Sequence, residues 1–315
     1  MDDHSGTVLT FGESMLLFAA DTAGDLATAG RFTRRLCGAD SNVAIGLARL
    51  GFAVSYLSRV GDDAFGRYIR ATLATEGVAT DAIQCDPARP TGVMFKSRRD
   101  DGGDPQTQYY RAGSAASALA PGDLDRVAHH RLRHLHVSGI SAALGASVLA
   151  LCHHAIDRAR AQGATVSFDP NLRPALWPDP ALMRTQIDAL AARCDWLLIG
   201  IGEAEQLIDS RDIETIAAHY LGLGSGEVVI KLGADGAALR SRDARFDAAP
   251  LAVAQVVDTV GAGDAFACGF ISARLDGLDA RGALARGNAF GARAVQHPGD
   301  YESLPRRDEL TADLH

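Results

Sequence analysis

The sequence predicts an α/β fold in which helices cover both faces of a mostly parallel central sheet. Short apolar runs of strand length alternate with longer helical patterns along most of the chain, as expected for parallel strands joined by helical crossovers. The 315 residues, 47% of them hydrophobic, are enough for one large domain of this kind, or two modest ones, with a sizeable core. The charged fraction of 22% is ordinary and argues against a disordered chain.

The individual elements follow from the same alternation. The apolar runs that predict core strands are residues 8–11, 54–59, 134–138, 165–169, 196–199 and 228–232. The helical patterns are residues 41–50, 64–76, 147–161, 183–192, 265–275 and 280–295. Helix-start signals agree with this order, as where Asp40 and Ser41 precede an apolar run.

Two stretches, about residues 13–37 and 91–112, break the alternation. They contain β-like pieces at 15–19 and 92–96, joined by charged or glycine-rich connectors. Residues 98–105, Arg-Arg-Asp-Asp-Gly-Gly-Asp-Pro, are a strong turn signal, so the second stretch predicts a hairpin. We interpret the two stretches as a small sheet that stands off the main domain as a lid over a site. Edge elaborations without function are the alternative.

Charge and cysteine usage limit the partners and the compartment. The formal net charge of −8 argues against duplex nucleic acid or an anionic membrane as the main partner, and an anionic substrate would need a locally basic pocket. The five cysteines are scattered, which suits a reducing compartment. The N-terminus is acidic, unlike that of a signal peptide, and no apolar run approaches the roughly 18 residues of a membrane span. We therefore expect a cytoplasmic protein.

Residues 258–266, Asp-Thr-Val-Gly-Ala-Gly-Asp-Ala-Phe, form the most informative segment. Gly261, Ala262 and Gly263 are small residues directly before a helix that we expect to begin near Asp264. Small residues let the backbone approach a ligand, and the first N–H groups of a helix are unpaired and point outward. The segment is therefore suited to an anion, such as the charge on a transferring phosphoryl group.

Asp264 lies within reach of that anion. A site that only binds phosphate would not need a carboxylate there. The carboxylate of Asp264 makes sense as the base that accepts a proton from a hydroxyl attacking phosphorus. The alternative is a helix cap, since aspartate is common near helix N-termini. Two other phosphate-binding patterns are absent. Neither Lys96 nor Lys231, the chain's two lysines, stands in a Gly-Lys-Ser/Thr loop, and only Gly12 follows the first strand, where a dinucleotide fold carries three glycines.

With this segment the chain resembles the ribokinase-like (PfkB) family of carbohydrate kinases, whose C-terminal signature is D-T-x-G-A-G-D. The resemblance runs along nearly the whole chain. It implies a single ribokinase-like kinase domain over residues 1–315, with a three-layer α/β/α core, a mostly parallel sheet and a small β-sheet lid. It also implies that the N–H groups of residues 261–263 bind the phosphoryl oxygens and that Asp264 is the catalytic base. Cys268 stands where the family usually has Ser, Ala, Gly or Val.

Residues 37–51 are similar to the N-terminal G-G-x-x-x-N stretch of the family, which approaches the sugar hydroxyls. The resemblance implies this role for Gly38 and Asn42, whereas Cys37 replaces the first glycine of the pattern. Structural roles are the alternative, because Gly38 also precedes a predicted helix and Asn42 would lie near its N-terminus.

Residues 228–236 are similar to the strand and turn that line the nucleotide site of the family. The resemblance implies ATP binding by Lys231, Gly233 and Gly236, and it places Asn288 near adenine, with an ordinary polar position on a helix as the alternative. It further implies Mg²⁺ held through water by Glu203, although Gly200 stands where the family's N-x-x-E motif has asparagine. A monovalent cation is a further expected cofactor.

Two loops contain residues that indicate which acceptor the protein binds. Arg173 lies in a loop stiffened by two prolines after a predicted strand, and Tyr109 and Arg111 lie at the end of the predicted lid. An arginine in each loop suggests a two-armed clamp for a carboxylate. This pairing resembles the members of the family that phosphorylate 2-keto-3-deoxygluconate. The lid tyrosine that those kinases often have after Thr-Gly would fall at Met94.

Several alternatives stay open. The acceptor could instead be fructose, ribose, 5-keto-2-deoxygluconate or a nucleoside. A nonenzymatic sugar or nucleotide sensor would need the fold without the base, and a dehydrogenase would show a glycine fingerprint after the first strand. The sequence does not give the oligomeric state, although an exposed lid sheet could pair with a second copy in a homodimer or higher homo-oligomer. The clustered histidines at 129–136 and 153–154 lack the spacing of a zinc site, and we expect them to be solvated.

Overall fold

The computed structural model describes residues 6–99, 105–127 and 129–310. Within them a nine-stranded sheet has the order β13-β12-β11-β10-β9-β8-β1-β4-β5. Its strands are β1 (Thr7–Phe11), β4 (Val54–Gly61), β5 (Ile83–Asp86), β8 (Leu132–Ser138), β9 (Thr165–Asp169), β10 (Trp196–Gly200), β11 (Glu227–Lys231), β12 (Ala237–Ser241) and β13 (Arg245–Ala248). Every neighbouring pair from β11 to β5 is parallel, whereas β12 and β13 pair in antiparallel fashion at one edge. The predicted mostly parallel sheet is confirmed.

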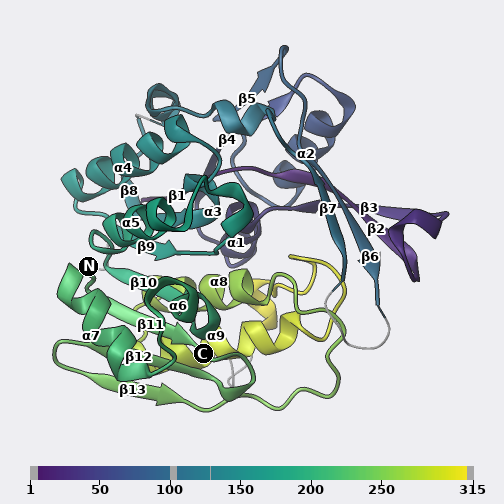
Figure 1. Cartoon of the computed structure of the whole chain (residues 1–315). Coiled ribbons are helices and arrows are strands. Elements are labelled where there is room, and N and C mark those ends of the chain that lie inside the picture. Colours follow the sequence, from purple (N-terminus) through teal and green to yellow (C-terminus); the bar gives the residue numbers. More distant parts are fainter. Residues whose placement is uncertain (1–5, 100–104, 128, 311–315) are drawn as a thin grey trace.

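Helices cover both faces of this sheet (Figure 1). Side chains from α1 (Ala39–Arg49), α2 (Ala64–Thr75), α8 (Ala262–Leu275) and α9 (Ala280–Ala294) form the core on one face. Side chains from α3 (Gly139–Ala142), α4 (Ala146–Ala161), α5 (Pro180–Ala191), α6 (Ile201–Ile208) and α7 (Ile213–Leu223) form the core on the other. Short 3-10 turns lie at Leu26–Thr28, Ala115–Ala118, Pro121–Val127, Pro174–Leu176, Gly233–Asp235 and Arg307–Glu309. The predicted three layers are thus present.

The two cores explain why the strands read as continuous apolar runs. Along β1, Val8 belongs to the core of α1 and α8, and its neighbour Leu9 belongs to the opposite core. Along β11, Val229 and Val228 divide between the two cores in the same way. Because successive strand residues point to opposite faces, a strand that is covered on both sides must be apolar throughout.

A second sheet, which we call the lid sheet, projects from the main body (Figure 1). Its strand order is β3-β2-β6-β7, with β2 (Met15–Ala23), β3 (Phe32–Cys37), β6 (Val93–Arg98) and β7 (Thr107–Tyr110). The pairs β2–β3 and β6–β7 are antiparallel and β2–β6 is parallel. All four strands come from the stretches 13–37 and 91–112. The predicted turn over 98–105 includes residues 100–104, which lie outside the described residues.

Some elements were not predicted. The helices α6 and α7 and the strands β5, β12 and β13 have no counterpart among the predicted elements. One reason is the absence of a turn signal, since β10 ends at Gly200 and α6 begins at the very next residue, Ile201. Another is length, since β5 and β13 have four residues each, too few for a clear period. None of the helices that the structure describes has the length and apolarity needed to cross a bilayer.

The histidines of β8 differ from the expectation. His134 and His136 are buried, and their ring nitrogens bond to the hydroxyls of Thr165 and Ser167 at 2.7–2.8 Å. Burial lowers the pKa of both rings, so they are neutral at physiological pH. The prediction that they are solvated is wrong because β8 lies in the middle of the sheet, between β9 and β1.

Candidate active site

The segment singled out by sequence forms a tight turn into α8. Gly261 has a φ of 81° and is the N-cap of the helix, which begins at Ala262 rather than near Asp264 as predicted. A Cβ at Gly261 would lie 2.5 Å from the carbonyl oxygen of Asp300, so both the dihedral angle and the packing require glycine. The helix therefore starts earlier, and the N–H groups of Gly263 and Asp264 belong to its first turn, where no helical carbonyl can accept them.

Asp264 does not cap the helix. Its Oδ2 accepts a hydrogen bond from Nδ2 of Asn42 at 2.8 Å, and its Oδ1 accepts one from Nδ2 of Asn171 at 3.1 Å. No side chain makes a cap hydrogen bond at Gly261. Two amides from other parts of the chain thus fix the carboxylate in place, which removes the simple cap as an explanation for this aspartate.

The surroundings of Asp264 make it a better base than an ordinary aspartate. Burial raises its pKa above the usual value, and this effect outweighs the hydrogen bond from Asn42 and the positive charges of Lys231 and Arg173, which lower it. Glu203 raises the pKa further. A carboxylate with a raised pKa accepts a proton more readily than an ordinary aspartate does.

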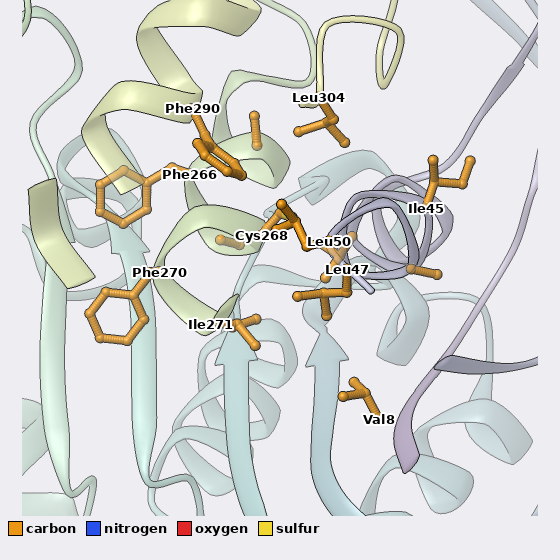
Figure 2. Packing of buried hydrophobic residues seen from close by; sticks show 14 of the residues in the cluster. Val8, Ile45, Leu47, Leu50, Phe266, Cys268, Phe270, Ile271, Phe290 and Leu304 are labelled. Atoms are coloured by element: carbon orange, nitrogen blue, oxygen red, sulfur yellow. The ribbon is translucent and has the colours of Figure 1, made fainter. Parts of the chain in front are cut away.

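Helix packing explains why Asn42 reaches Asp264. One turn further along α1, Gly46 packs against Cys268, which is one turn further along α8. A Cβ at Gly46 would lie 2.4 Å from the Sγ of Cys268, so only glycine allows the two helices to approach this closely. Figure 2 shows Cys268 of α8 beside the residues of α1 in this core. The contact between 46 and 268 therefore sets the contact between 42 and 264.

Lys231 approaches the same helix N-terminus from the end of β11. Its Nζ is 2.6 Å from Oδ2 of Asp169 and 3.7 Å from the position that a Cβ would take at Gly263. Burial alone would lower the pKa of Lys231, but the charges of Asp169, Glu203 and Asp264 raise it overall, so the ammonium stays charged. A fixed positive charge beside a helix N-terminus is suited to an anion.

Glu203 connects two parts of the site. Its Oε1 accepts the N–H of Leu172 at 2.8 Å, and its Oε2 accepts the N–H of Gly200 at 2.7 Å. The carboxylate thereby fastens the loop after β9 to the start of α6. A Cβ at Gly200, where the family pattern has asparagine, would lie 3.0 Å from Oε2 of Glu203, so a larger residue there would require this carboxylate to shift slightly. Water-mediated binding of Mg²⁺ by Glu203 stays a prediction.

A cavity of about 680 Å³ opens beside this helix N-terminus. Its lining includes four of the residues predicted to bind the nucleotide, which are Lys231, Gly233, Gly236 and Asn288. Gly236 has a φ of 95°, and a Cβ there would lie 2.2 Å from the carbonyl oxygen of Ala248. Asn288 donates to the carbonyl oxygens of Ala248 and Ala249 at 3.3 and 3.0 Å, so it also supports the cavity wall.

The lid meets the core at a buried carboxylate, Glu13. Arg111 places Nη2 at 2.5 Å and Nε at 2.6 Å from Oε2 of Glu13, and both side chains are buried. Gly38, the N-cap of α1, has a φ of 149°, and a Cβ there would lie 2.5 Å from the carbonyl oxygen of Glu13. Position 92 also requires glycine, since a Cβ there would lie 2.6 Å from Oε1 of Glu13. Gly38 and Arg111 are therefore neighbours of one buried acid.

The other two predicted acceptor residues are more exposed. Arg173 follows the loop after β9 and donates to the carbonyl oxygen of Leu172 at 2.8 Å, and its charge acts on Asp264. Tyr109 is 43% exposed, and the guanidinium of Arg111 lies 5.9 Å from its ring centre. Met94, where related kinases often have the lid tyrosine, pairs with Tyr109 across β6 and β7.

Sequence reasoning missed several residues of this arrangement. Asn171 holds Asp264 and has an unusual φ of 37°, and Asp169 pairs with Lys231. Their position directly after β9 was a signal, since ligands bind at the carboxyl ends of parallel strands. Glu13 and Lys96 gave no such signal, because their partners Arg111 and Asp258 are far away in the sequence.

The comparison with known families agrees with this geometry. The family model described as pfkB family carbohydrate kinase matches residues 6–307. The chain belongs to this family. As a pfkB carbohydrate kinase, it is 45% identical over 307 residues to the 2-dehydro-3-deoxygluconokinase of Bacillus subtilis (strain 168), covering 97% of this chain and 94% of the relative. It is 36% identical to the 2-dehydro-3-deoxygluconokinase of Thermoproteus tenax, with 95% and 91% covered, and 34% identical to a fructokinase of Klebsiella pneumoniae, with 90% and 94% covered.

Solved structures of pfkB kinases and their relatives share the fold. The PfkB protein from Polaromonas sp. JS666 is 44% identical, with a TM-score of 0.89 and coverage of 98% of this chain and 100% of that chain. A putative ribokinase II from E. coli in complex with ATP and Mg²⁺ is 29% identical, with a TM-score of 0.87 over 96% and 97%. A fructokinase double mutant from Vibrio cholerae O395, bound to fructose, ADP and potassium ion, is 26% identical, with a TM-score of 0.87 over 100% of both chains. The predicted ribokinase-like fold is confirmed.

Proposed function

We propose that this carbohydrate kinase uses ATP to phosphorylate a hydroxyl of a sugar acid, and that its substrate is 2-keto-3-deoxygluconate, converted to 2-keto-3-deoxy-6-phosphogluconate. The observation that carries the reaction type is Asp264, a carboxylate with a raised pKa held by two amides at the N-terminus of α8. The substrate assignment is supported by the two curated 2-dehydro-3-deoxygluconokinases to which the chain is 45% and 36% identical.

The site residues divide the chemistry of an in-line transfer among them. Asp264 takes the proton of the attacking hydroxyl as its oxygen bonds to the γ-phosphorus and the bond from phosphorus to the ADP oxygen breaks. The N–H groups at the start of α8 and the ammonium of Lys231 stabilise the negative charge on the transferring group. The Oδ1 atoms of Asn42 and Asn171 are buried without a partner among the described residues, so these amides also offer acceptors for sugar hydroxyls.

The residues present fit ATP with Mg²⁺. The lining of the cavity of about 680 Å³ includes Gly263 and Lys231, which supports binding of the phosphates beside the helix N-terminus. A Cβ at Gly263 would meet nothing but Lys231, so there is room for a phosphate next to the backbone. Bound Mg²⁺ neutralises charge on the β- and γ-phosphates. Asp169 and Glu203, whose charges act on each other, are the carboxylates that would hold Mg²⁺ through its water ligands.

The acceptor proposal assigns the substrate carboxylate to Arg111 and Arg173. Glu13 holds Nε and Nη2 of Arg111, which fixes the direction of the guanidinium and leaves Nη1 for a second partner. Arg173 is exposed, and its Nη1 donates to the carbonyl oxygen of Leu172. The fixed guanidinium of Arg111 on the lid side and the more adjustable one of Arg173 after β9 would together bind a carboxylate in a defined orientation.

A neutral hexose is the second candidate acceptor. The 34% identity to a fructokinase over 90% of the chain favours fructose among the neutral sugars. Ribose, 5-keto-2-deoxygluconate and nucleosides are further alternative acceptors. A sensor without catalytic activity is disfavoured by Asp264, since binding alone does not require a base held by two amides.

The test of the proposed function is an ATP-consumption assay with purified protein across sugar acids, neutral sugars and nucleosides. We expect 2-keto-3-deoxygluconate to give the highest kcat/KM. A higher value for fructose or ribose would overturn the substrate assignment and keep the reaction type. No turnover with any acceptor would overturn the enzyme assignment.

We also propose that the protein acts in the cytoplasm as a homo-oligomer joined through the lid. All five cysteines are free, which supports a reducing compartment. One face of the lid carries a cluster of aromatic rings, Phe18, Phe32, Phe95 and Tyr110, with Tyr110 59% exposed. A second copy covering this face would bury the rings. Light scattering of the wild type and of Tyr110→Ser tests the assembly, with a smaller mass expected for the variant.

A further inference from the structure

Lys96 is a buried lysine on the lid sheet. It lies on β6, is 5% exposed, and places its Nζ 2.5 Å from Oδ2 of Asp258. The pair joins the lid to the start of the 258–264 segment, 162 positions further along the chain. Burying an ammonium removes its hydration shell, which is costly unless a counter-charge is close. The presence of a buried lysine at this position therefore needs an explanation other than packing.

Both lysines of the chain lie close to the turn that leads into α8. Of the 31 lysines and arginines, only Lys96 and Lys231 are lysines. Lys231 faces the start of α8 from the nucleotide cavity, and Lys96 contacts Asp258 from the lid. An ammonium is a compact point charge, whereas a guanidinium is a wide planar fork. The distribution indicates that a compact cation is needed at both places.

The partner of Lys96 shapes the backbone that leads into α8. Oδ1 of Asp258 accepts the N–H of Val260 at 3.1 Å, while Oδ2 contacts Lys96. The side chain of Asp258 is 12% exposed. Without a positive charge beside it, this carboxylate would be driven to move away from the nearby acids or to turn toward water. Either change would release the N–H of Val260 and loosen the turn before Gly261.

A second acid lies at the back of the same turn. Asp300 is buried, its Oδ1 has no hydrogen-bond partner among the described residues, and its backbone oxygen packs against Gly261. Burial raises the pKa of Asp300 to about 7, Lys96 opposes this rise, and Asp264 and Asp258 add to it. The ammonium of Lys96 therefore acts on two acids that flank one turn.

We propose, on the basis of the kinase function above, that Lys96 is a positioning residue that serves as an internal monovalent cation. Its ammonium neutralises Asp258 and Asp300 and holds residues 258–261 in the shape that presents the N–H groups of α8 to the phosphoryl group. Because Lys96 is carried by the lid, the turn is complete only while the lid is docked. The wild-type enzyme consequently needs no dissolved monovalent cation at this place.

The surrounding space makes the proposal testable by rescue. A cavity of about 360 Å³ between the lid and the 256–259 loop is lined by Lys96, Asp258 and Thr259. A small cation can therefore reach Asp258 once the lysine is shortened or made apolar. Ammonium and potassium ions are small enough to enter, whereas tetramethylammonium is bulky and cannot make the same close contact with a carboxylate oxygen.

The experiment compares wild type, Lys96→Met and Arg35→Ala in chloride salts of tetramethylammonium, sodium, potassium and ammonium at equal ionic strength. Arg35→Ala is the matched control, because it removes another lid-to-body ion pair, Arg35–Glu302 at 2.6 Å, without touching Asp258. The readouts are kcat, KM for ATP and the melting temperature. The sugar acceptor is whichever one the wild type turns over.

In tetramethylammonium we expect Lys96→Met to lower kcat by about 10-fold or more, with a smaller change in KM for ATP, because a charge-assisted contact is lost. Ammonium or potassium should restore several-fold of that loss and raise the melting temperature of Lys96→Met, since a ligand that binds only the folded state stabilises it. Wild type and Arg35→Ala should show neither response. A wild type activated several-fold by potassium, a Lys96→Met enzyme with unchanged kcat, or one that no cation rescues would overturn the proposal.

If Lys96→Met does not fold, the neutral pair Lys96→Met/Asp258→Asn replaces it, because removing both charges avoids leaving one buried and unpaired. We expect this double variant to fold, to have low kcat and to ignore cations, and wild-type kcat would overturn the proposal. The melting-temperature readout needs no turnover. A protein inactive with every acceptor would therefore contradict the kinase function, while the cation response would still test Lys96.

Discussion

Nδ2 of Asn42 donates to Oδ2 of Asp264 across 2.8 Å, although the two residues are 222 positions apart. The bond joins the first turn of α1 to the first turn of α8 and ties a residue expected to bind the sugar to the expected base. Four residues further along each helix, Gly46 and Cys268 set the close approach that makes it possible. The residue expected to bind the acceptor and the expected base are therefore linked mechanically through one helix pair.

Asp264→Asn and Asp264→Ala should abolish turnover while ATP binding stays largely intact. Loss of a general base typically costs ~10²–10⁴-fold in rate. Because the raised pKa of Asp264 means that its ionised form is disfavoured by the fold, Asp264→Asn should melt at or above the wild-type temperature at neutral pH. Steady-state kinetics, ATP calorimetry and thermal melting check the three parts, and a variant with near wild-type kcat would sink the assignment of Asp264 as base.

Gly261→Val and Gly263→Val should both lower kcat, because a side chain would block the approach of phosphate to the backbone. The structure predicts different effects of the two substitutions on stability. At Gly261 a side chain must also adopt a positive φ and meets Asp300, so this variant should lose stability as well. At Gly263 a Cβ meets only Lys231, so the fold should be kept. A stably folded Gly263→Val with normal kinetics would show that the phosphoryl group binds elsewhere.

Arg111→Ala and Arg173→Ala should each weaken use of 2-keto-3-deoxygluconate and leave activity with a neutral sugar nearly unchanged. Hydrogen bonds to charged groups contribute about 1.5–3 kcal/mol, which is roughly 10- to 150-fold in kcat/KM. Arg→Lys should rescue only partly, since lysine lacks the planar fork. Steady-state kinetics with both kinds of acceptor is the measurement, and equal losses for both would remove the carboxylate clamp.

The control for Arg111 follows from its partner. Arg111→Ala leaves Glu13 buried without a counter-charge, which is expected to destabilise the fold. The double variant Arg111→Ala/Glu13→Gln removes both charges and should recover much of the melting temperature without recovering use of the keto acid. Recovery of catalysis along with stability would show that Arg111 acts only through the fold.

Asn42→Leu should move the acidic limb of the pH profile of kcat/KM to higher pH. The hydrogen bond from Asn42 lowers the pKa of Asp264, so its removal lets burial raise that pKa further. The base works only when deprotonated, so activity is lost as the pH falls through its pKa, and a higher pKa means loss at a higher pH. A profile that only drops in height, with its acidic limb unmoved, would argue that Asn42 does not act on Asp264.

Gly46→Ala should destabilise the fold and lower kcat, because the added methyl meets the sulfur of Cys268 at the α1–α8 contact. The compensating variant Gly46→Ala/Cys268→Gly should regain stability, since the side chain opposite is gone. Thermal melting and kinetics of the single and double variants measure this coupling. Additive effects of the two changes would show that the contact does not set the helix spacing.

Local pattern was enough for much of the fold and for the reaction type. The alternation of apolar runs and helical patterns predicts the parallel sheet with two covered faces, because period and length are local properties of the sequence. The two stretches that form the lid sheet can be recognised because they interrupt this alternation. The run from Asp258 to Asp264 predicts an anion site and a base, because small residues before a helix and an acid at its start are also local signals.

Only the tertiary structure decided which distant groups surround these residues. The sequence does not reveal that Asn171 holds Asp264, that Glu13 holds Arg111, or that Lys96 contacts Asp258. Each of these contacts joins segments that neither share a period nor lie close along the chain. They arise because burial of charged groups in a low-dielectric site is tolerated only with partners, and the packing of helices and lid determines which partners are within reach.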